Sequence, residues 1–434
     1  MTVRVIGAGL AGCEAAYQLA KQGIGVELYE MKPKKFSAAH KNKNFCELVC
    51  SNSLKAERIE NACGLLKAEM RLFDSVMMRS ADVAKVPAGG ALAVDRDIFA
   101  ETATKIIREN PLITVINDEF TEIDTKIPTI IATGPLTSDR LSEKIAKLTN
   151  SQGLYFFDAA APIITKDSID MDKVFYGARY GRGTDDYINC PMTKEQYNEF
   201  YNALIQAETA HLKDFEGTEV FEGCMPVEVM AKRGEQTLLF GPLKPVGLTN
   251  PKTGKDDSFA VVQLRQDNRE ASLYNIVGFQ TNLKWSEQKR VFSMIPGLRN
   301  AEFVRYGVMH RNTYLDSPRI LNKYYQMKEY PNIFFAGQIT GVEGYVESAS
   351  SGILAGFNMA RKILGKDFFE PNKVTAIGAL PLYISDERIE KLQPMNANFG
   401  IIESLGERVK SKQERYNKIA QRALGTLKDA LDKE

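Results

Sequence analysis

The order of apolar and polar residues at the start of the chain predicts a strand, a helix and a second strand. Residues 3–6 form a short apolar run, VRVI, and residues 26–29 form a second one, VELY. We predict a helix over residues 11–22, because this segment lies between the two runs and is followed by Gly23, where glycine commonly ends a helix. The order predicts a βαβ unit.

The later pattern indicates two architectures along the chain. Alternating strands and helices fill the first 155 residues, and strands that run into glycine turns are expected at 128–136 and 331–341. Between about 155 and 330, short apolar runs are separated by turn-rich loops, which predicts antiparallel strands. We therefore expect an α/β fold with a Rossmann-like domain made of residues 1–155 and 330–434, and an α+β substrate domain inserted at 156–329.

Local signals predict further elements in both parts. The apolar positions of residues 64–84 have helical spacing and predict one helix with a buried stripe. Thr193 and Gln196 form a capping-box pair at the start of a helix that we expect to end at Ala210. Other helices are expected at 97–109 and 348–364, and other strands at VINDEFTEI (115–123), TLLF (237–240), FAVVQLR (259–265) and LYNIVGF (273–279).

The turn after the first strand has the glycine pattern of a dinucleotide site, G-x-G-x-x-G. Gly7 allows a tight turn, Gly9 leaves room for a pyrophosphate, and Gly12 lets the helix lie close to the strand. Glu30 ends the second strand, near the distance of about 20 residues at which a carboxylate accepts a hydrogen bond from a ribose hydroxyl. The expected cofactor contacts are Gly7, Ala8, Gly9, Leu10, Ala11, Gly12 and Glu30. The alternative is a glycine-rich turn that only packs.

The identity of the nucleotide is narrowed by an acid and by two later segments. An acid at position 30 disfavours a 2′-phosphate, which favours FAD or NAD over NADP. Residues 128–136 and 331–341 resemble the later strands of two-dinucleotide-fold flavoproteins. That resemblance favours FAD and adds Gly134, Gly337 and Gln338 to the cofactor site.

Composition excludes several classes of protein. At 434 residues the chain exceeds one average domain, and it has no apolar run long enough to span a membrane. We see no signal peptide and expect a cytoplasmic protein without a membrane partner. The 56 basic and 55 acidic residues nearly cancel, so an RNA partner needs a local basic patch. Residues 408–422 either form that patch or are a solvated helix face.

The six cysteines are expected to be thiols, and no metal site is expected, because no C-x-x-C pair occurs. Three of them, Cys13, Cys63 and Cys190, are interpreted as small buried hydrophobes.

Seven stretches carry a close resemblance to one family. The chain resembles, over nearly its whole length, the folate- and FAD-dependent tRNA (uracil-5-)-methyltransferases. The stretches are ELVCSNSL (47–54), VPAGGALAVDR (86–96), YFFDAAAPI (155–163), FEGCMPVEVMA (221–231), LLFGPLKPVGL (238–248), YGVMHRNTYL (306–315) and AGQITGVEGYVESASSG (336–352). The resemblance implies an enzyme that forms 5-methyluridine at position 54 of the tRNA T-loop. It also implies FAD as cofactor, 5,10-methylenetetrahydrofolate as carbon donor and NAD(P)H as reductant.

The same resemblance implies the catalytic residues. Uracil C5 is a poor nucleophile, and a thiolate that adds at C6 makes it reactive. Cys224 matches the family's nucleophile, and Cys50 matches its second cysteine, which is placed by the flavin as a base for the C5 proton or as a guard of the activated flavin. His310 matches the histidine that stacks on the folate pterin. Cys46 departs from the family pattern and lies four residues from Cys50, with which it could pair under oxidation.

Several alternatives stay open at this point. Lys244, Arg265 and Arg311 are candidate anchors for folate carboxylates or RNA phosphates, and each is otherwise a surface charge. A paralogue that methylates a uridine of 23S rRNA would share the same chemistry. A different class is a non-catalytic flavin-binding RNA chaperone or redox sensor. We expect a monomer, although the sequence does not determine the oligomeric state.

Overall fold

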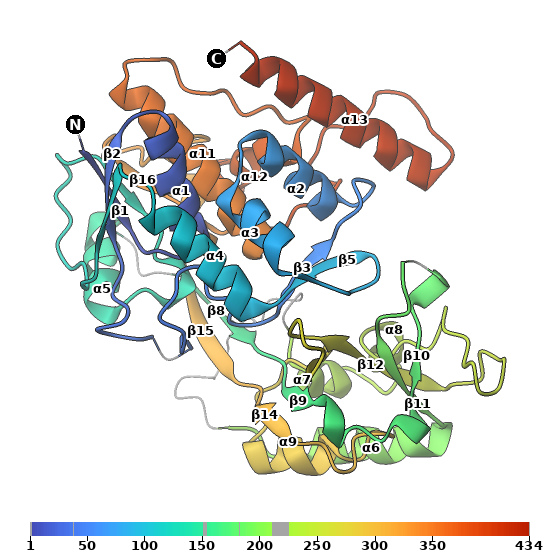
Figure 1. Cartoon of the computed structure of the whole chain (residues 1–434). Coiled ribbons are helices and arrows are strands. Elements are labelled where there is room, and N and C mark those ends of the chain that lie inside the picture. Colours follow the sequence, from blue (N-terminus) through green and yellow to red (C-terminus); the bar gives the residue numbers. More distant parts are fainter. Residues whose placement is uncertain (1, 38, 151–153, 182, 211–224, 434) are drawn as a thin grey trace.

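The chain is described here by a computed structural model covering residues 2–37, 39–150, 154–181, 183–210 and 225–433, with the backbone alone at 154–159 and 310–313. It forms two lobes (Figure 1). The first lobe contains a parallel sheet covered by helices, and the second contains an antiparallel sheet. The expected α/β fold with an inserted α+β domain is confirmed. The domain boundaries stay predictions.

The sheet of the first lobe has five strands in the order β16-β7-β1-β2-β6, and every pairing is parallel. Helix α1 (Leu10–Lys21) connects the first two strands, as predicted. The strands are β1 (Thr2–Ile6), β2 (Gly25–Tyr29), β6 (Ile113–Ile116), β7 (Thr129–Ile131) and β16 (Ile333–Phe335). Strand β16 follows the second lobe in sequence, so the sheet combines segments from before and after that lobe.

Helix α11 (Tyr345–Ile363) packs along α1, and two of its glycines make this possible. A Cβ atom at Gly352 would lie 2.1 Å from the carbonyl oxygen of Ala11, and one at Gly356 would lie 2.6 Å from that of Ala15. Side chains at these positions would separate the helices. These two glycines therefore let α11 lie close against α1.

The predicted single helix at residues 64–84 is wrong. The structure has two helices, α2 (Ala62–Leu72) and α3 (Val76–Ala84), separated by Asp74 in a left-handed conformation with φ +60°. Ser75 starts the second helix, since its side chain accepts a hydrogen bond from the amide of Met78. The other helices of this lobe are α4 (Arg96–Arg108), α5 (Asp139–Leu148), α10 (Ser317–Ile320) and α12 (Ala376–Ile384), and a small antiparallel sheet contains β3 (Ser53–Ala56), β4 (Lys85–Val86) and β5 (Ala91–Val94).

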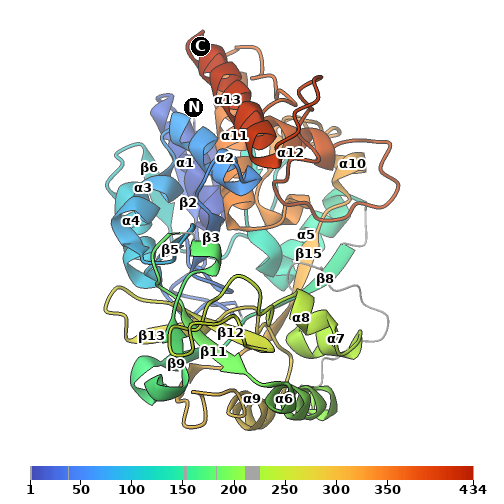
Figure 2. The same cartoon turned by 90° about the vertical axis from the view of Figure 1, so that its right-hand side faces the viewer.

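The second lobe has a six-stranded antiparallel sheet in the order β10-β11-β12-β13-β9-β14. The Thr193–Gln196 capping box is confirmed at the start of α6 (Lys194–Gln206), and α6 and α9 form the layer farthest from the first lobe (Figures 1 and 2). The strands are β9 (Ile163–Thr165), β10 (Phe175–Tyr176), β11 (Ile188–Met192), β12 (Ala260–Gln266), β13 (Leu273–Ile276) and β14 (Phe303–Arg305), and the other helices are α7 (Val227–Lys232), α8 (Thr237–Phe240) and α9 (Trp285–Phe292).

The predicted strand TLLF is wrong, because these residues form the short helix α8. Of its four residues only Leu238 is buried, whereas Phe240 is 81% exposed. A strand at these residues would need a neighbouring strand to pair with, and its apolar side chains would point to both faces of the sheet and need to be buried there. A single helical turn buries one leucine and satisfies its backbone locally.

The two lobes are joined by an antiparallel pair, β8 (Leu154–Ala159) and β15 (Met309–Tyr314), which places residue 310 opposite residue 158. Strand β15 also contacts two short 3-10 turns of the first lobe, η1 (Gly134–Leu136) and η6 (Gln338–Thr340). The chain therefore passes from the second lobe directly to the predicted cofactor site.

The C-terminal helix α13 (Lys412–Leu431) packs against α2 on the outside of the first lobe (Figure 2). Its core contacts are made by Ile419, Ala420, Ala423 and Leu427, and its basic residues lie mainly on the exposed side. Within the part of the chain that the structure describes, no helix combines the length and the apolar character of a membrane span.

Candidate active site

The glycine turn after β1 is tightly constrained at two of its three glycines. Gly7 has φ +96°, and a Cβ atom there would lie 2.8 Å from the carbonyl oxygen of Ala132 on the neighbouring strand. A Cβ atom at Gly12 would lie 1.7 Å from the carbonyl oxygen of Gly7. Gly9 differs, because nothing lies within 4 Å of the position of its Cβ. Side chains are thus excluded at Gly7 and Gly12 by the fold, and Gly9 opens onto empty space.

The start of α1 offers backbone amides toward that space. Gly9 is the N-cap of α1, and it provides no side-chain hydrogen bond to the first turn. The first amides of a helix have no partner within the helix and carry a partial positive charge. This is the arrangement that binds phosphate groups in nucleotide sites.

Glu30 holds the turn in place. Its carboxylate accepts a hydrogen bond of 2.9 Å from the amide of Ala8 and another of 2.9 Å from the amide of Lys32. The side chain is buried at the end of β2. A carboxylate has about four acceptor positions, so these two bonds leave capacity for ribose hydroxyls.

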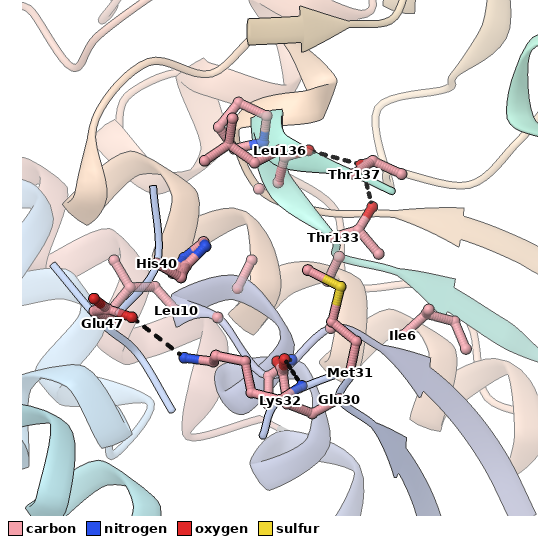
Figure 3. Close-up of a pocket in the computed structure, with 18 of the residues that line it drawn as sticks. Ile6, Leu10, Glu30, Met31, Lys32, His40, Glu47, Thr133, Leu136 and Thr137 are labelled. Carbon is pink, nitrogen blue, oxygen red and sulfur yellow. Dashed lines mark hydrogen bonds and ion pairs between the residues drawn. The ribbon is translucent and has the colours of Figure 1, made fainter. Parts of the chain in front are cut away.

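A cavity that is partly open to solvent lies at the carboxyl ends of β1, β2, β7 and β16 (Figure 3). Ligands of open parallel sheets bind at this edge, where strands on either side of a central strand diverge. All but one of the predicted cofactor residues line the cavity: Gly7, Ala8, Gly9, Leu10, Ala11, Glu30, Gly134, Gly337 and Gln338. The exception, Gly12, lies behind the turn and permits the contact between strand and helix.

Two further glycine turns complete the far side of the cavity. Gly134 follows β7 with φ +66°, and Gly337 follows β16 with φ +87°. The amide of Gly337 donates a hydrogen bond of 2.7 Å to Oγ of Ser351 on α11. Gln338 donates through Nε2 to Oε2 of Glu343 at 2.6 Å. The segment is therefore fixed before any ligand arrives.

The loop of residues 42–52, which we call the Cys50 loop, forms the opposite wall. The amide of Cys46 donates to the carbonyl oxygen of Ala8 at 3.1 Å, which lays the loop on the glycine turn. Lys32 is buried, and its Nζ donates to the carbonyl oxygens of Asn42 at 3.0 Å and Asn44 at 2.5 Å. Lys32 also forms an ion pair of 3.5 Å with Glu47 (Figure 3).

Cys50 is half-buried in this wall, and Tyr345 holds its backbone. The Tyr345 hydroxyl accepts hydrogen bonds from the amide of Cys50 at 2.6 Å and from that of Ser51 at 3.3 Å. Burial raises the pKa of Tyr345 well above its ordinary value, so the hydroxyl stays protonated. Cys50 is thus tied to the first residue of α11, 295 positions along the chain.

Two arginines support the same loop from behind. Arg265 is 7% exposed and donates to Oδ1 of Asn52 at 3.1 Å and to Oγ of Ser51 at 2.8 Å. Arg96 donates to the carbonyl oxygens of Leu48 and Val49 and pairs with Asp267 at 3.1 Å. The interpretation of Arg265 as a surface charge is therefore wrong, because it joins the second lobe to the Cys50 loop.

His40 lines the cavity, although its sequence context carries no functional signal. Its Nδ1 lies 2.6 Å from Oγ of Ser37. Burial, together with the charge of Lys32, lowers the pKa of the ring below its ordinary value. The neutral form of His40 therefore faces the cavity at pH 7.

The comparisons with known proteins agree with this geometry. The sequence model of the family described as Glucose inhibited division protein A matches residues 2–367. The methylenetetrahydrofolate–tRNA-(uracil-5-)-methyltransferase TrmFO of Acetivibrio thermocellus is 62% identical over 431 residues, which cover 99% of each chain. The TrmFO of Ligilactobacillus salivarius is 59% identical and covers 98% of each chain. The chain belongs to the TrmFO family. The resemblance seen in the sequence is confirmed.

Solved structures support the fold. Aquifex aeolicus GidA in its form I crystal has a TM-score of 0.71 at 15% identity, over 99% of this chain and 76% of that chain. The form II crystal gives a TM-score of 0.69. At such low identity, the likeness concerns the fold alone.

Two other residues that the family resemblance implies, Cys224 and His310, are wholly or partly outside the residues that the structure describes. Cys224 is outside the described residues, and the next residue, Met225, is buried in the second lobe. His310 is in β15, the strand that reaches the cofactor turns, and its side chain is not described. Cys13, Cys63 and Cys190 are buried, in line with their interpretation as core residues.

The sequence reasoning missed most of the residues that support the Cys50 loop. Lys32, Arg96 and Tyr345 hold the loop through long-range contacts, which a sequence motif does not specify. For Lys32 and Tyr345 an indirect signal existed in the sequence, because each is next to a segment already assigned to the site. Lys32 follows Glu30 by two residues, and Tyr345 begins the helix after the Gly337 turn.

Proposed function

We propose that this chain binds FAD in the cavity and transfers a one-carbon unit from 5,10-methylenetetrahydrofolate to C5 of a uridine in tRNA. The observation that carries the proposal is that one cavity has a nucleotide-binding turn on one wall and Cys50 on the other. The fit to FAD is supported by the open space at Gly9, by the uncapped start of α1 and by Glu30. The names of the relatives that are 58–62% identical support tRNA and folate as substrates.

Each residue then has a defined task. FAD, when bound and reduced by NAD(P)H, would supply the hydride that turns the transferred carbon into a methyl group. Cys224, as a thiolate, adds to uracil C6 and makes C5 nucleophilic, and its departure restores the C5–C6 double bond. Cys50 accepts the C5 proton or guards the cofactor. His310 stacks on the pterin, and Glu30 orients the ribose of the nucleotide.

The finer points belong to the same proposal. We propose position 54 of the T-loop as the target, the cytoplasm as the location, and the domain boundaries 1–155, 156–329 and 330–434. A paralogue acting on 23S rRNA would use the same cavity and differ only in its RNA surface. The names of the relatives favour tRNA.

The source of the methyl carbon tests the proposal. Purified protein is incubated with NAD(P)H, unmodified tRNA or rRNA transcripts, and either labelled methylenetetrahydrofolate or labelled S-adenosylmethionine. We expect label from the folate in 5-methyluridine of tRNA. Label that comes only from S-adenosylmethionine refutes the folate chemistry, and label only in rRNA shows that the paralogue activity is correct.

The two cysteine roles are separated by a trapping experiment. A tRNA containing 5-fluorouridine keeps its C5 fluorine where the natural base loses a proton, so the thiolate adduct persists. We expect the covalent adduct with wild type and with Cys50→Ala, and none with Cys224→Ala. An adduct that survives in Cys224→Ala and is lost in Cys50→Ala reverses the assignment.

A further inference from the structure

Three aromatic rings stack in a row on the second lobe, and we call them the aromatic column. The rings of Phe303 and Tyr306 are 5.2 Å apart with an interplanar angle of 7°, and those of Tyr306 and Trp285 are 5.4 Å apart with an angle of 12°. Tyr306 is shared by both pairs, so the three planes are nearly parallel. Most other aromatic pairs in the described part of the chain are tilted or edge-on.

The column has an end that packs against the core and an open end. Phe303 is half-buried and packs against the core of the second lobe, and Tyr306 is also half-buried. Trp285 is 61% exposed although one face of its ring lies against Tyr306. Its opposite face must therefore account for much of the exposed area. An exposed tryptophan held parallel to a supporting ring presents a flat surface on which another planar group can stack.

The column is held rigidly. Trp285 is the first residue of α9, whose Val291 and Phe292 are buried in the core. The buried side chain of Gln288 donates to the carbonyl oxygen of Gly307 at 2.9 Å and accepts from the amide of Gly307 at 2.8 Å. This pair of bonds fixes α9 to the segment that carries Tyr306. A surface that is ordered before binding loses little entropy when a partner arrives.

The column lies next to the chain that enters the active site. Arg305 stands between Phe303 and Tyr306 in sequence, and it lines a hollow together with Leu48 and Arg96 behind the Cys50 loop. The segment after Tyr306 continues into β15, which contacts the cofactor turns η1 and η6. One end of the column is therefore next in sequence to a residue that faces the Cys50 loop.

The charge around the column suits a polyanion. Lys289 and Arg290 are exposed on α9, and Arg299 is exposed on the turn that follows it. Arg290 is balanced by Glu287 on the same helix, at 2.6 Å. Lys284, next to Trp285, is paired with Glu208 at 2.5 Å, so the positive charge of this surface comes from Lys289 and Arg299, which form no ion pair among the described residues. A protein partner of ordinary size would require a broader apolar surface than one indole ring.

We propose that the aromatic column is a stacking platform for an unpaired base of the RNA substrate, close to the uridine that enters the active site. The proposal rests on the proposed function, because it takes RNA as the substrate class. Stacking on an aromatic side chain is the usual way in which proteins hold unpaired bases, and it does not depend on the base. The platform would hold a nucleotide near the target while basic side chains contact the phosphates.

The chain contains one tryptophan, so its intrinsic fluorescence reports on the column directly. Wild-type holoenzyme is titrated with an unmodified tRNA transcript, and binding is measured in parallel by filter retention. We expect the tryptophan emission to be quenched with the same midpoint as binding. Trp285→Ala should weaken binding by about 5- to 150-fold, the range typical of a lost stacked base.

Matched variants separate stacking from structure. Trp285→Phe keeps a ring and should bind within a few-fold of wild type. Phe240→Ala removes another exposed aromatic of the same lobe, one that makes no ring contact among the described residues, and should bind RNA like wild type. In methylation assays, Trp285→Ala should raise KM for tRNA and leave kcat and the bound flavin unchanged. All three variants should melt close to the wild-type temperature.

The outcomes also distinguish this proposal from the function on which it rests. If wild type binds tRNA and transfers the folate carbon, but its emission does not change and Trp285→Ala binds normally, only the platform is refuted. If wild type binds no RNA, both proposals fail. If the emission instead changes with protein concentration in the absence of RNA, and Trp285→Ala abolishes a dimer, the column is a protein interface and the proposal is overturned.

Discussion

The two walls of the cavity are built in different ways. The wall that contains Gly7, Gly9 and Glu30 comes from 28 consecutive residues, 3–30, and Glu30 bonds the glycine turn within the same βαβ unit. The Cys50 loop is held by Tyr345 and Arg265, which are more than 200 positions away in sequence. Cofactor binding and the placement of the thiol therefore depend on different contacts, although Lys32 and the amide of Cys46 join the two walls. Changes at Tyr345 or Arg265 should leave the first wall intact.

The largest effect is expected from a pair of glycine variants in the first wall. Gly12→Ala places a methyl group 1.7 Å from the carbonyl oxygen of Gly7, where backbone has to move. We expect a loss of unfolding free energy of about 3 kcal/mol and colourless protein. Gly9→Val has open space and an ordinary φ of −75°, so it should fold normally and lose only the flavin.

Melting temperature and flavin absorbance, measured on both glycine variants, check this contrast. A Gly12→Ala protein that is yellow and as stable as wild type would contradict the close packing of turn and helix. A Gly9→Val protein that keeps its flavin would show that the pyrophosphate lies elsewhere.

The next effect concerns the second wall. Tyr345→Phe removes the acceptor of the Cys50 and Ser51 amides, which should cost about 1–3 kcal/mol in the position of the loop. We expect methyl transfer to fall by about 10- to 100-fold with the flavin content unchanged. Tyr383→Phe is the control, because that hydroxyl belongs to α12 and has only a long hydrogen bond of 3.4 Å. Parallel loss of flavin and activity in Tyr345→Phe would mean that the two walls are not independent.

A smaller effect is expected from the Lys32 clamp, the contacts by which this side chain joins the two walls. Lys32→Met leaves the carbonyl oxygens of Asn42 and Asn44 without their shared donor, and it removes the ion pair with Glu47. We expect weaker flavin binding, by about 10-fold, because the loop no longer closes on the glycine turn. Lys105→Met on α4, at an exposed pair with Glu109, should change the affinity little. Equal affinities in the two variants would refute the clamp.

The effect on the two walls is smallest for the last prediction, a pH dependence of stability outside the cavity. Burial raises the pKa of Glu69 from 4.5 to about 8, and the carboxyl group accepts hydrogen bonds from the amides of Ala376 and Ile377. Because the folded pKa is above the unfolded one, the stabilisation is complete below about pH 4.5 and is lost as the pH rises through about 8. The unfolding free energy should therefore fall between pH 5 and pH 8.5, and Glu69→Gln should reduce that slope.

Denaturant unfolding at several pH values checks this slope. Glu14, whose pKa burial raises to about 7, contributes with the same sign and keeps part of the slope in Glu69→Gln. Glu101→Gln on the exposed side of α4 controls for the change of charge alone. A slope that is the same in wild type and Glu69→Gln would contradict the assignment.

The wall with the glycine turn could be predicted from the sequence, whereas the contacts that hold the Cys50 loop could not. The strand, turn, helix and acid of residues 3–30 have fixed spacings, since each is set by backbone geometry over a few residues. Tyr345 and Arg265 reach the Cys50 loop only in the folded chain, so no spacing between residues in the sequence predicts these contacts. Only the family resemblance placed Cys50 near the flavin.

The wrong secondary-structure predictions have similarly physical causes. The apolar residues of 64–84 have a spacing that fits one helix, but Asp74 has a left-handed conformation that interrupts it. Ser75 then starts a second helix with its own buried face. The run TLLF is too short for its period to distinguish a strand from a helical turn. The start of the helix at the Thr193 capping box was predicted correctly, but the helix ends at Gln206 and not at Ala210.

The measurement that tests the central claim most directly is made on Cys50→Ser. The variant replaces one atom in the second wall, so we expect yellow protein with the flavin content of wild type. Given labelled methylenetetrahydrofolate, NAD(P)H and tRNA, wild type should form labelled 5-methyluridine and Cys50→Ser should form almost none. A Cys50→Ser protein that is colourless, or one that methylates tRNA at the wild-type rate, would contradict the account.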